Sequence, residues 1–295
     1  MSSSIHIVCA TDENYAPFAS IMMKSVLEHT SSFANFYVLD GGIQKKTKSL
    51  ILKDLKKYPN KHIQYIDMAK YDLARFPNVK HYSLNTFSRY FIPEFLPNIQ
   101  RVLYLDVDII VTKDIAKLYN YNLDNFPIGA VLEDFYEENY TTLKQKIWPD
   151  YQGQDQYFNA GVLLLDIPKL NQMNFTDKAV NLTIQLFDKL SCPDQDVLNI
   201  LFENNFKKLD YRFNFMPDHI HHLREKHPNL SKIDPMVIHY CWKKPWKDMS
   251  LAQTEFDKIA KNSLFQKRLK KTYHTKSTSK FLLFGKIPLF IRTIQ

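Results

Sequence analysis

The eleven-residue stretch 101–111 limits the possible folds more than any other part of the chain. Five of the six residues from 102 to 107 are apolar or aromatic, which indicates a strand buried on both faces of a parallel sheet. Asp106 and Asp108 interrupt this run, and a regular strand would bring both side chains to one side. Two carboxylates repel each other unless a cation lies between them, and oxygen ligands suit Mg²⁺ or Mn²⁺. The stretch therefore predicts a metal–phosphate site at the C-terminal end of a buried strand, where open α/β sheets bind ligands.

The rest of the chain alternates short apolar runs with segments of helical periodicity. We expect strands at 5–10, 35–39, 62–66, 128–132, 162–166 and 237–240, and helices at 16–29, 44–58 and 194–204. This alternation is typical of βαβ units and predicts an α/β domain with a mostly parallel central sheet flanked by helices. The six glycines form neither a Walker-type nor a dinucleotide-type phosphate loop, so those two nucleotide-binding classes are unsupported.

The positive charge of the chain is concentrated at its C-terminal end. Residues 265–295 contain eight of the 39 Lys and Arg residues and none of the 31 Asp and Glu residues, so residues 1–264 have 31 of each sign. We divide the chain into a neutral domain, 1–264, and a basic amphipathic tail, 265–295, which we expect to associate with an anionic membrane surface. A solvated, disordered tail is the alternative, and the neutral domain argues against nucleic acid as a partner.

The sequence contains no signal for export or for membrane insertion. Its three cysteines are isolated, no apolar segment follows Met1, and no apolar run approaches the roughly 18 to 20 residues of a spanning helix. We therefore expect a cytoplasmic protein that the tail holds at the inner face of the cell membrane.

Two segments have residues suited to a nucleotide and a metal. At the end of the first expected strand, the ring of Tyr15 could stack on a base while Asp12 and Asn14 bond its edge, although either polar residue could instead cap the next helix. His239 follows another apolar run, and imidazole is a common third ligand beside carboxylates. A hydrogen-bonded core histidine is the alternative for this position. Nearby lysines would neutralise a diphosphate.

Two polar clusters lie at the ends of other expected elements. Asn159 and Gly161 stand just before a strand, where a ligand could approach the backbone closely. Asp194, Gln195 and Asp196 stand at a helix start, where capping by Asp194 is the alternative to ligand binding.

Taken in order, these segments resemble glycosyltransferase family 8, the retaining nucleotide-sugar transferases that include bacterial lipopolysaccharide galactosyl- and glucosyltransferases and glycogenin. The resemblance covers about residues 5–250 and rests on five ordered motifs: 10–15, 88–94, 105–108, 159–161 with 194–196, and 239–246. It implies a GT-A fold that binds Mn²⁺ (or Mg²⁺) and UDP-galactose or UDP-glucose, and that transfers the hexose to a glycan or glycolipid acceptor.

The resemblance also assigns residues to each part of the site, position by position. Uracil and ribose are held by Ala10, Asp12, Asn14 and Tyr15. The metal is bound by Asp106, Asp108 and His239, with Val107 between the carboxylates. The sugar hydroxyls are bound by Arg89, Asn159, Ala160 and Asp194, and the diphosphate by Lys244. Gln195 lies near the anomeric carbon, opposite the leaving group, and with Asp194 forms the catalytic pair.

One motif departs from the pattern of the family. The last motif usually reads His-x-x-Gly-x-x-Lys-Pro-Trp, whereas this chain has one residue fewer and Trp242 in the region of the glycine. The departure leaves open whether Lys243 or Lys244 contacts the diphosphate. One alternative function is a two-metal phosphoryl or nucleotidyl transferase, which would need further clustered carboxylates near Asp106. The other is a non-enzymatic protein that binds a membrane or nucleic acid.

Overall fold

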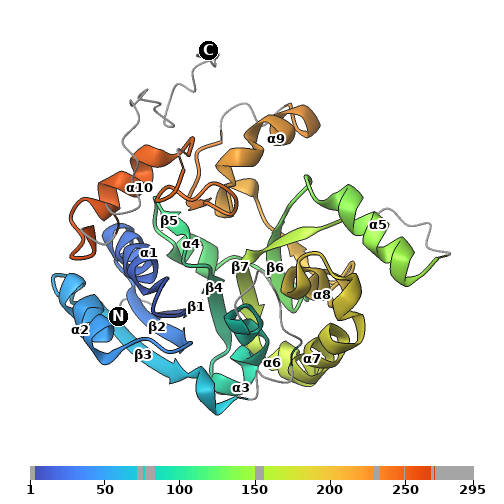
Figure 1. Ribbon diagram of the computed structural model, residues 1–295, viewed down its shortest axis with the longest axis horizontal. Helices are drawn as coiled ribbons and strands as arrows, with labels where there is room; N and C mark the ends of the chain where they lie inside the picture. The colour runs from blue at the N-terminus through green and yellow to red at the C-terminus, as the bar shows by residue number, and fades with distance from the viewer. Residues whose placement is uncertain are drawn as a thin grey trace.

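The computed structural model describes residues 4–71, 76, 84–149, 156–228, 233–248, 250–266 and 269. They form a central sheet of seven strands in the order β3-β2-β1-β4-β7-β6-β8 (Figure 1). The strands are β1 (Ser4–Thr11), β2 (Phe33–Asp40), β3 (Lys61–Asp67), β4 (Arg101–Leu105), β6 (Ile128–Leu132), β7 (Phe158–Asp166) and β8 (Lys207–Lys208). Strand β7 runs antiparallel to both of its neighbours, and the other pairs are parallel. The expected mostly parallel sheet is confirmed.

Helices cover both faces of this sheet. One face carries α1 (Ala16–His29), α2 (Lys45–Asp54), α4 (Ala116–Tyr119), α10 (Gln253–Ala260) and a two-stranded sheet of β5 (Ile109–Val111) and β9 (Val237–His239). The other face carries the 3-10 helix η3 (Leu84–Phe91), α3 (Ile92–Phe95), α6 (Ile167–Gln172), α7 (Phe175–Leu186) and α8 (Pro193–Leu201). Toward one edge lie α5 (Glu137–Ile147), η6 (Pro217–His219) and α9 (Ile220–Lys226).

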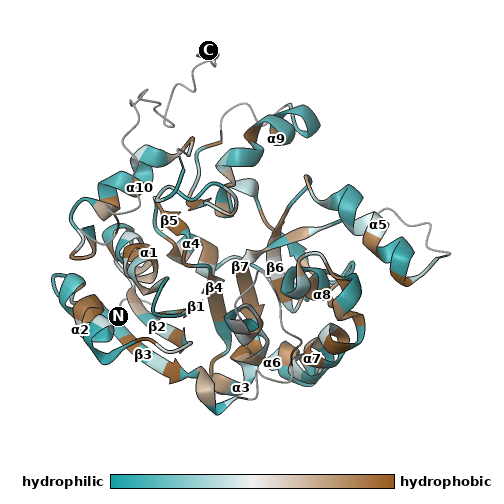
Figure 2. Cartoon of the chain, in the orientation of Figure 1, coloured by the Kyte–Doolittle hydropathy of each residue, from teal (hydrophilic) through white to brown (hydrophobic). Residues whose placement is uncertain are grey.

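Apolar side chains alternate between the two cores along each central strand. In β4, Leu103 and Leu105 pack on the α1 side, whereas Val102 and Tyr104 pack on the α7 side. Side chains of a strand point alternately to the two faces, so a strand covered by helices on both sides must be apolar throughout. Figure 2 shows this as hydrophobic strands enclosed by helices that are hydrophilic on their outer faces.

The order of the strands determines where a ligand can bind. The chain runs outward from β1 through β2 to β3 and then returns to β4, on the opposite side of β1. The loops that follow β1 and β4 therefore diverge from the same edge of the sheet, and a crevice opens between them. The two aspartates predicted to bind metal follow β4 at this edge.

Two differences from the expected boundaries affect the site, while others only lengthen or shorten an element, as where α2 ends at Asp54 rather than at 58. Strand β4 ends at Leu105, and residues 107 and 108 form a turn before β5, so a continuous strand does not align the two aspartates. Strand β7 begins at Phe158, so Asn159 to Gly161 lie inside a strand rather than before it. In both places a local turn or a pairing with a neighbouring strand, which sequence periodicity does not reveal, sets the boundary.

The basic tail lies mostly outside the described residues, which end at 269. Of its first residues, Phe265 and Leu269 are buried in the core, and the backbone N–H of Leu264 donates to Asp54 Oδ1 at 2.8 Å. Among the described helices, none combines the length and the apolar character needed to cross a bilayer.

Candidate functional site

A cavity of about 500 Å³ opens at the C-terminal edge of β1, β4 and β6. Twelve of the residues predicted from the sequence line it: Ala10, Asp12, Tyr15, Arg89, Asp106, Val107, Asp108, Asn159, Asp194, Gln195, His239 and Lys244. Asn14 and Ala160 are not among the lining residues. Asn14 lies in the exposed turn before α1. Ala160 takes part through its backbone, whose C=O accepts from Arg89 and whose N–H donates to Gln195.

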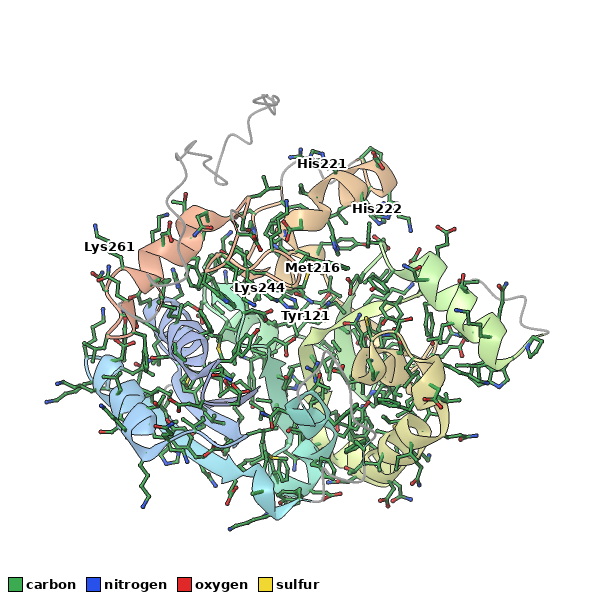
Figure 3. All side chains as sticks on the ribbon, in the orientation of Figure 1. Tyr121, Met216, His221, His222, Lys244 and Lys261 are labelled. Carbon is green, nitrogen blue, oxygen red and sulfur yellow. The ribbon has the colours of Figure 1, made fainter. Side chains whose placement is uncertain are left out.

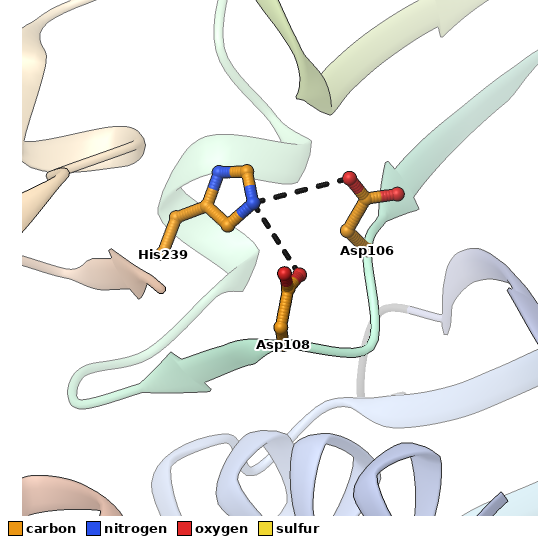
Figure 4. A group of neighbouring side chains, drawn as sticks. All are labelled: Asp106, Asp108 and His239. Carbon is orange, nitrogen blue, oxygen red and sulfur yellow. Dashed lines mark ion pairs between the residues drawn. The ribbon is translucent and has the colours of Figure 1, made fainter. Parts of the chain in front are cut away.

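Asp106, Asp108 and His239 form one cluster, which we call the carboxylate corner (Figure 4). One ligand atom from each residue lies within 4.8 Å of the other two. His239 Nε2 is 3.3 Å from Asp108 Oδ1 and 3.9 Å from Asp106 Oδ2. The antiparallel pairing of β5 with β9 places Ile109 opposite His239 and so brings the histidine beside the turn. Two carboxylates and an imidazole are a suitable donor set for a divalent cation.

The carboxylate of Asp106 is fixed by two donors on one of its oxygens. Tyr104 Oη donates to Asp106 Oδ1 at 2.7 Å, and the Arg89 guanidinium donates to the same atom at 3.1 Å. Oδ2 is the oxygen that faces His239. A Cβ at Gly161 would lie 2.8 Å from Oδ2 and 2.3 Å from His239 Cε1. Only glycine leaves room for the corner at this position.

A chain of buried amides orients the ring of His239. Glu133 Oε2 accepts a hydrogen bond from Asn159 Nδ2 at 2.9 Å, and Asn159 Oδ1 accepts one from Asn214 Nδ2 at 2.9 Å. Asn214 therefore presents Oδ1 to His239 Nδ1 at 3.0 Å. This network assigns the proton to Nδ1 and leaves the lone pair of Nε2 directed at the carboxylates, as a metal ligand requires.

Lys244 occupies the other side of Asp108. Its Nζ contacts Asp108 Oδ2 and also donates to the carbonyl oxygens of Tyr240 at 2.6 Å and Cys241 at 3.0 Å. Burial alone would raise the pKa of Asp108, but the positive charge of Lys244 and the His239 imidazole hold this pKa below its ordinary value. Figure 3 shows Lys244 among the side chains in the centre of the molecule, whereas Lys261 lies at its periphery. Lys243 is exposed, so Lys244 is the lysine that lines the cavity.

The side-chain amide of Gln195 is held by three hydrogen bonds. Its Oε1 accepts from the Ala160 N–H at 2.8 Å. Its Nε2 donates to Glu133 Oε2 and to Tyr157 Oη, both at 3.1 Å. Glu133 is buried, and burial raises the pKa of its carboxyl group. The Glu133 carboxylate thus positions Gln195 directly, and it positions His239 through Asn159 and Asn214.

Asp194 and Asp196, at the start of α8, have different partners. Asp196 Oδ2 accepts from the N–H groups of Ser191 and Cys192, both at 2.8 Å, and so fixes the segment that leads into the helix. Asp194 instead lines the cavity, where its Oδ2 is 3.2 Å from Arg89 Nε. The capping role considered for Asp194 is not observed, because Cys192 is at the N-cap position and no side-chain hydrogen bond caps α8. Burial raises the pKa of Asp194, while the charge of Arg89 lowers it.

The segment after β1 forms the opposite wall. Asp12 Oδ1 accepts from the N–H groups of Asn14 and Tyr15 at 2.9 and 3.0 Å, which closes the turn before α1. The ring of Tyr15 packs at 5.7 Å from Phe18 and 6.4 Å from Trp246 and is 37% exposed. Asp12 closes the turn and lines the cavity, but the helix cap considered for Asp12 or Asn14 does not form, because Tyr15 is at the N-cap position and no side-chain hydrogen bond caps α1.

Several residues of the site are not among those predicted from the sequence. Glu133, Tyr136 and Cys241 line the cavity, and Asn214 holds His239 from behind. Glu133 directly follows an expected buried strand, which is the same signal that singled out Asp106. No comparable signal marks Asn214, because only the folded chain brings it to His239.

Several known proteins that resemble this chain are named as glycosyltransferases. It is 28% identical over 241 residues to a putative glycosyltransferase of Haemophilus influenzae, covering 81% of this chain and 72% of that protein. It is 30% identical to the glycosyltransferase GlyF of Streptococcus pneumoniae, covering 84% of this chain but only 58% of GlyF. It is 27% identical to the lipopolysaccharide 1,2-glucosyltransferase of Escherichia coli, covering 88% of this chain and 78% of that enzyme.

Solved structures give the same result for the fold. The crystal structure of the galactosyltransferase LgtC with donor and acceptor sugar analogs superposes with a TM-score of 0.75 at 29% identity, over 88% of this chain and 96% of that one. The central sheet with the corner at its edge is the GT-A fold of that enzyme. The family model for glycosyl transferase family 8 matches residues 6–250. The chain therefore belongs to glycosyl transferase family 8.

Proposed function

We propose that this protein is a retaining glycosyltransferase that moves galactose or glucose from a UDP-sugar to a surface-glycan acceptor such as lipopolysaccharide. One observation carries the proposal: the carboxylate corner and the fixed amide of Gln195 open into the same cavity of a family 8 chain. The named activities of the Escherichia coli relative and of LgtC support a hexose donor and a glycan acceptor.

The order of the strands suggests how the donor lies. Tyr15 and Asp12, after β1, would take the base and ribose, with Ala10 and Asn14 beside them. Asp106, Asp108 and His239, after β4, would hold the metal. Asn159 and Asp194, from β7 and α8, would face the sugar. Arg89 contacts both Asp106 and Asp194, so it would fix the metal-binding and the sugar-binding aspartate relative to each other.

In this proposal, the transfer breaks the bond between the anomeric carbon and the β-phosphate oxygen, forms a bond from that carbon to the acceptor hydroxyl oxygen, and releases UDP and the hydroxyl proton. Asp106, Asp108 and His239 would hold a divalent cation such as Mn²⁺, which would supply positive charge against the charge that develops on UDP. Lys244 would add a second positive charge at the diphosphate. Gln195 would present Oε1, held by the Ala160 N–H, near the anomeric carbon on the face opposite UDP. Both a weak nucleophile and a stabiliser of an oxocarbenium-like state fit this position.

The test is turnover of UDP-glucose and UDP-galactose by the purified protein, with and without Mn²⁺. We expect UDP release that requires the metal, and a product whose anomeric configuration, read by NMR, matches that of the donor. Equal UDP release in the presence of a chelator would overturn the metal dependence. Inverted configuration would overturn retention, and transfer of phosphate or nucleotide in place of hexose would favour the phosphoryl or nucleotidyl transferase.

The basic tail completes the proposal, because a membrane-bound acceptor would favour a membrane-associated enzyme. We expect vesicles that contain anionic lipid to bind the full chain, and binding to weaken when salt is added. Truncation after residue 269 keeps the buried Phe265 and Leu269 and should abolish this binding while sparing UDP-sugar hydrolysis. Unchanged vesicle binding after truncation would contradict the role of the tail.

A further inference from the structure

Four aromatic rings form a group beside the cavity, and two of them line it. They are Phe135 and Tyr136, which follow β6, His219 of η6, and Trp242, which follows β9. We call this group the aromatic rim. Tyr136 and Trp242 line the main cavity. Trp242 is 52% exposed and Phe135 46% exposed. Large apolar rings left half exposed beside a polar cavity are typical of a ligand surface.

The rings of the rim brace one another. Phe135 stacks on His219 with ring centres 4.7 Å apart. Trp242 lies 5.8 Å from His219 and 6.2 Å from both Phe135 and Tyr136. Tyr136 in turn stacks at 5.7 Å on Tyr157, which is fully buried. The exposed indole is therefore attached to the core through a continuous set of rings.

The loop that carries Trp242 is also fastened on both sides. The Lys243 N–H donates to Asp218 Oδ2 at 2.9 Å, which ties the loop to η6. The Lys244 side chain returns to the carbonyl oxygens of Tyr240 and Cys241. A ring held in place before the ligand arrives loses little conformational entropy on binding, so it contributes more of its contact energy to affinity.

The position of the rim identifies which part of the reaction it serves. In the sheet, β1 and β6 are separated by β4 and β7, and three strand spacings of about 4.8 Å put the two ends roughly 14 Å apart. Under the proposed function, the base lies after β1 and the sugar over β7 and α8. The rim then lies beyond the sugar, where the attacking hydroxyl of the acceptor must arrive.

We propose that the aromatic rim, with Trp242 as its main surface, binds the acceptor by stacking on one face of a sugar ring. This inference rests on the proposed function and names the class of acceptor: a glycan that presents a β-linked hexopyranose such as galactose or glucose. Such a ring has axial C–H groups on a face, and these carry partial positive charge that the negative face of indole attracts. Its hydroxyls lie around the edge of the ring or, at C4 of galactose, on the opposite face, so they stay solvated.

The experiment uses the full chain with UDP and Mn²⁺ present and methyl β-lactoside and methyl β-cellobioside as probes. Saturation-transfer NMR measures contact with the probe rings, and titration gives their affinities. We expect Trp242→Ala to weaken the better probe about tenfold, which corresponds to about 1.4 kcal/mol. Trp242→Phe, which keeps a ring, should restore most of the loss. Trp148→Ala, at another exposed tryptophan beyond α5, is the matched control and should bind normally.

A second measurement separates the acceptor from the donor. Hydrolysis of the UDP-sugar without acceptor gives the donor KM of Trp242→Ala. We expect this KM to change much less than the acceptor affinity, because the proposed place of the base is at the end of β1, three strands away from β6. A rise in the donor KM equal to the loss of acceptor affinity would overturn the proposal and assign the ring to the nucleobase. Unchanged affinity for both probes would also overturn it. Failure of the wild-type protein to turn over any UDP-sugar would refute the proposed function instead, and the NMR result would still stand on its own.

Discussion

The carboxylate corner and the aromatic rim belong to one cavity but are held in opposite ways. Each side chain of the corner is bonded to others: Asp106 to Tyr104 and Arg89, Asp108 to Lys244, and His239 to Asn214. Buried charges need such partners, because desolvation without them is costly. The rings of the rim pack against one another at centre distances of 4.7 to 6.2 Å, and two of them are about half exposed. A change in the corner should therefore disable the whole site, whereas a change in the rim should only tune it.

The largest effect is expected from Asp108→Asn. The amide keeps the shape but removes the charge that would bind the metal, so we expect UDP release to fall by roughly 10³-fold, the upper range for losing one electrostatic contact to a transition state. Initial rates at saturating UDP-sugar and Mn²⁺ measure this. Asp177→Asn, at an exposed acid of α7, should keep the wild-type rate. A rate within tenfold of wild type in Asp108→Asn would remove the corner from the reaction.

A smaller loss should follow from breaking the chain of amides behind His239. Asn214→Leu removes the acceptor for His239 Nδ1, so the ring loses its fixed tautomer. Outer partners of metal ligands typically contribute 10–100-fold in affinity, and we expect Mn²⁺ binding, read by calorimetry, to weaken in this range. Asn199→Leu removes another buried amide, which pairs with the Phe158 backbone, and should lower stability but spare Mn²⁺ affinity. Equal Mn²⁺ affinities in both variants would refute the positioning role.

The rim can be probed through pH. Burial lowers the pKa of His219 from 6.5 to about 4. Between these values the unfolded chain binds the proton and the folded chain does not, so the free energy of unfolding should fall as pH drops from about 6.5 through about 4. Urea denaturation across this range should show a shallower slope in His219→Leu. His62→Gln, at an exposed position of β3, should keep the wild-type slope. Identical slopes in wild type and His219→Leu would show that His219 does not stay neutral.

The smallest effect should come from Phe135→Leu. This ring braces Trp242 from the side, with planes 77° apart, and lies outside the main cavity lining. Loss of one aromatic pair contributes roughly 0.5–1 kcal/mol, so we expect acceptor KM to rise about two- to fivefold with the donor KM unchanged. A larger effect than that of Trp242→Ala would make Phe135, rather than Trp242, the principal surface of the rim.

The fold and the corner were predictable from sequence because both depend on local patterns. Helix α1 has the expected bounds, Ala16–His29, and β6 the expected Ile128–Leu132. The two aspartates were identified because carboxylates are rare in an apolar strand. The prediction that one regular strand aligns the two aspartates was wrong. A turn after Leu105 and the pairing of β5 with β9 bring them to His239 instead.

The connections within the amide chain and the rim were not predictable, because they join segments that are distant in sequence. Asn159 and His239 were predicted individually, and Glu133 follows an expected strand, but a buried asparagine in a loop such as Asn214 has no distinctive pattern. The rim joins residues more than 100 positions apart, such as Phe135 and Trp242. Trp242 stood out only as a departure from the family motif, and its neighbours in space give that departure a physical reason.

Calorimetry of UDP binding tests whether the carboxylate corner is a metal-dependent UDP site. We expect Mn²⁺ to tighten UDP binding to the wild-type protein at least tenfold, and we expect this gain to disappear in the double variant Asp106→Asn, Asp108→Asn while the protein stays folded. UDP affinity that is the same with Mn²⁺ as with a chelator in the wild-type protein would show that the corner does not hold UDP through a metal.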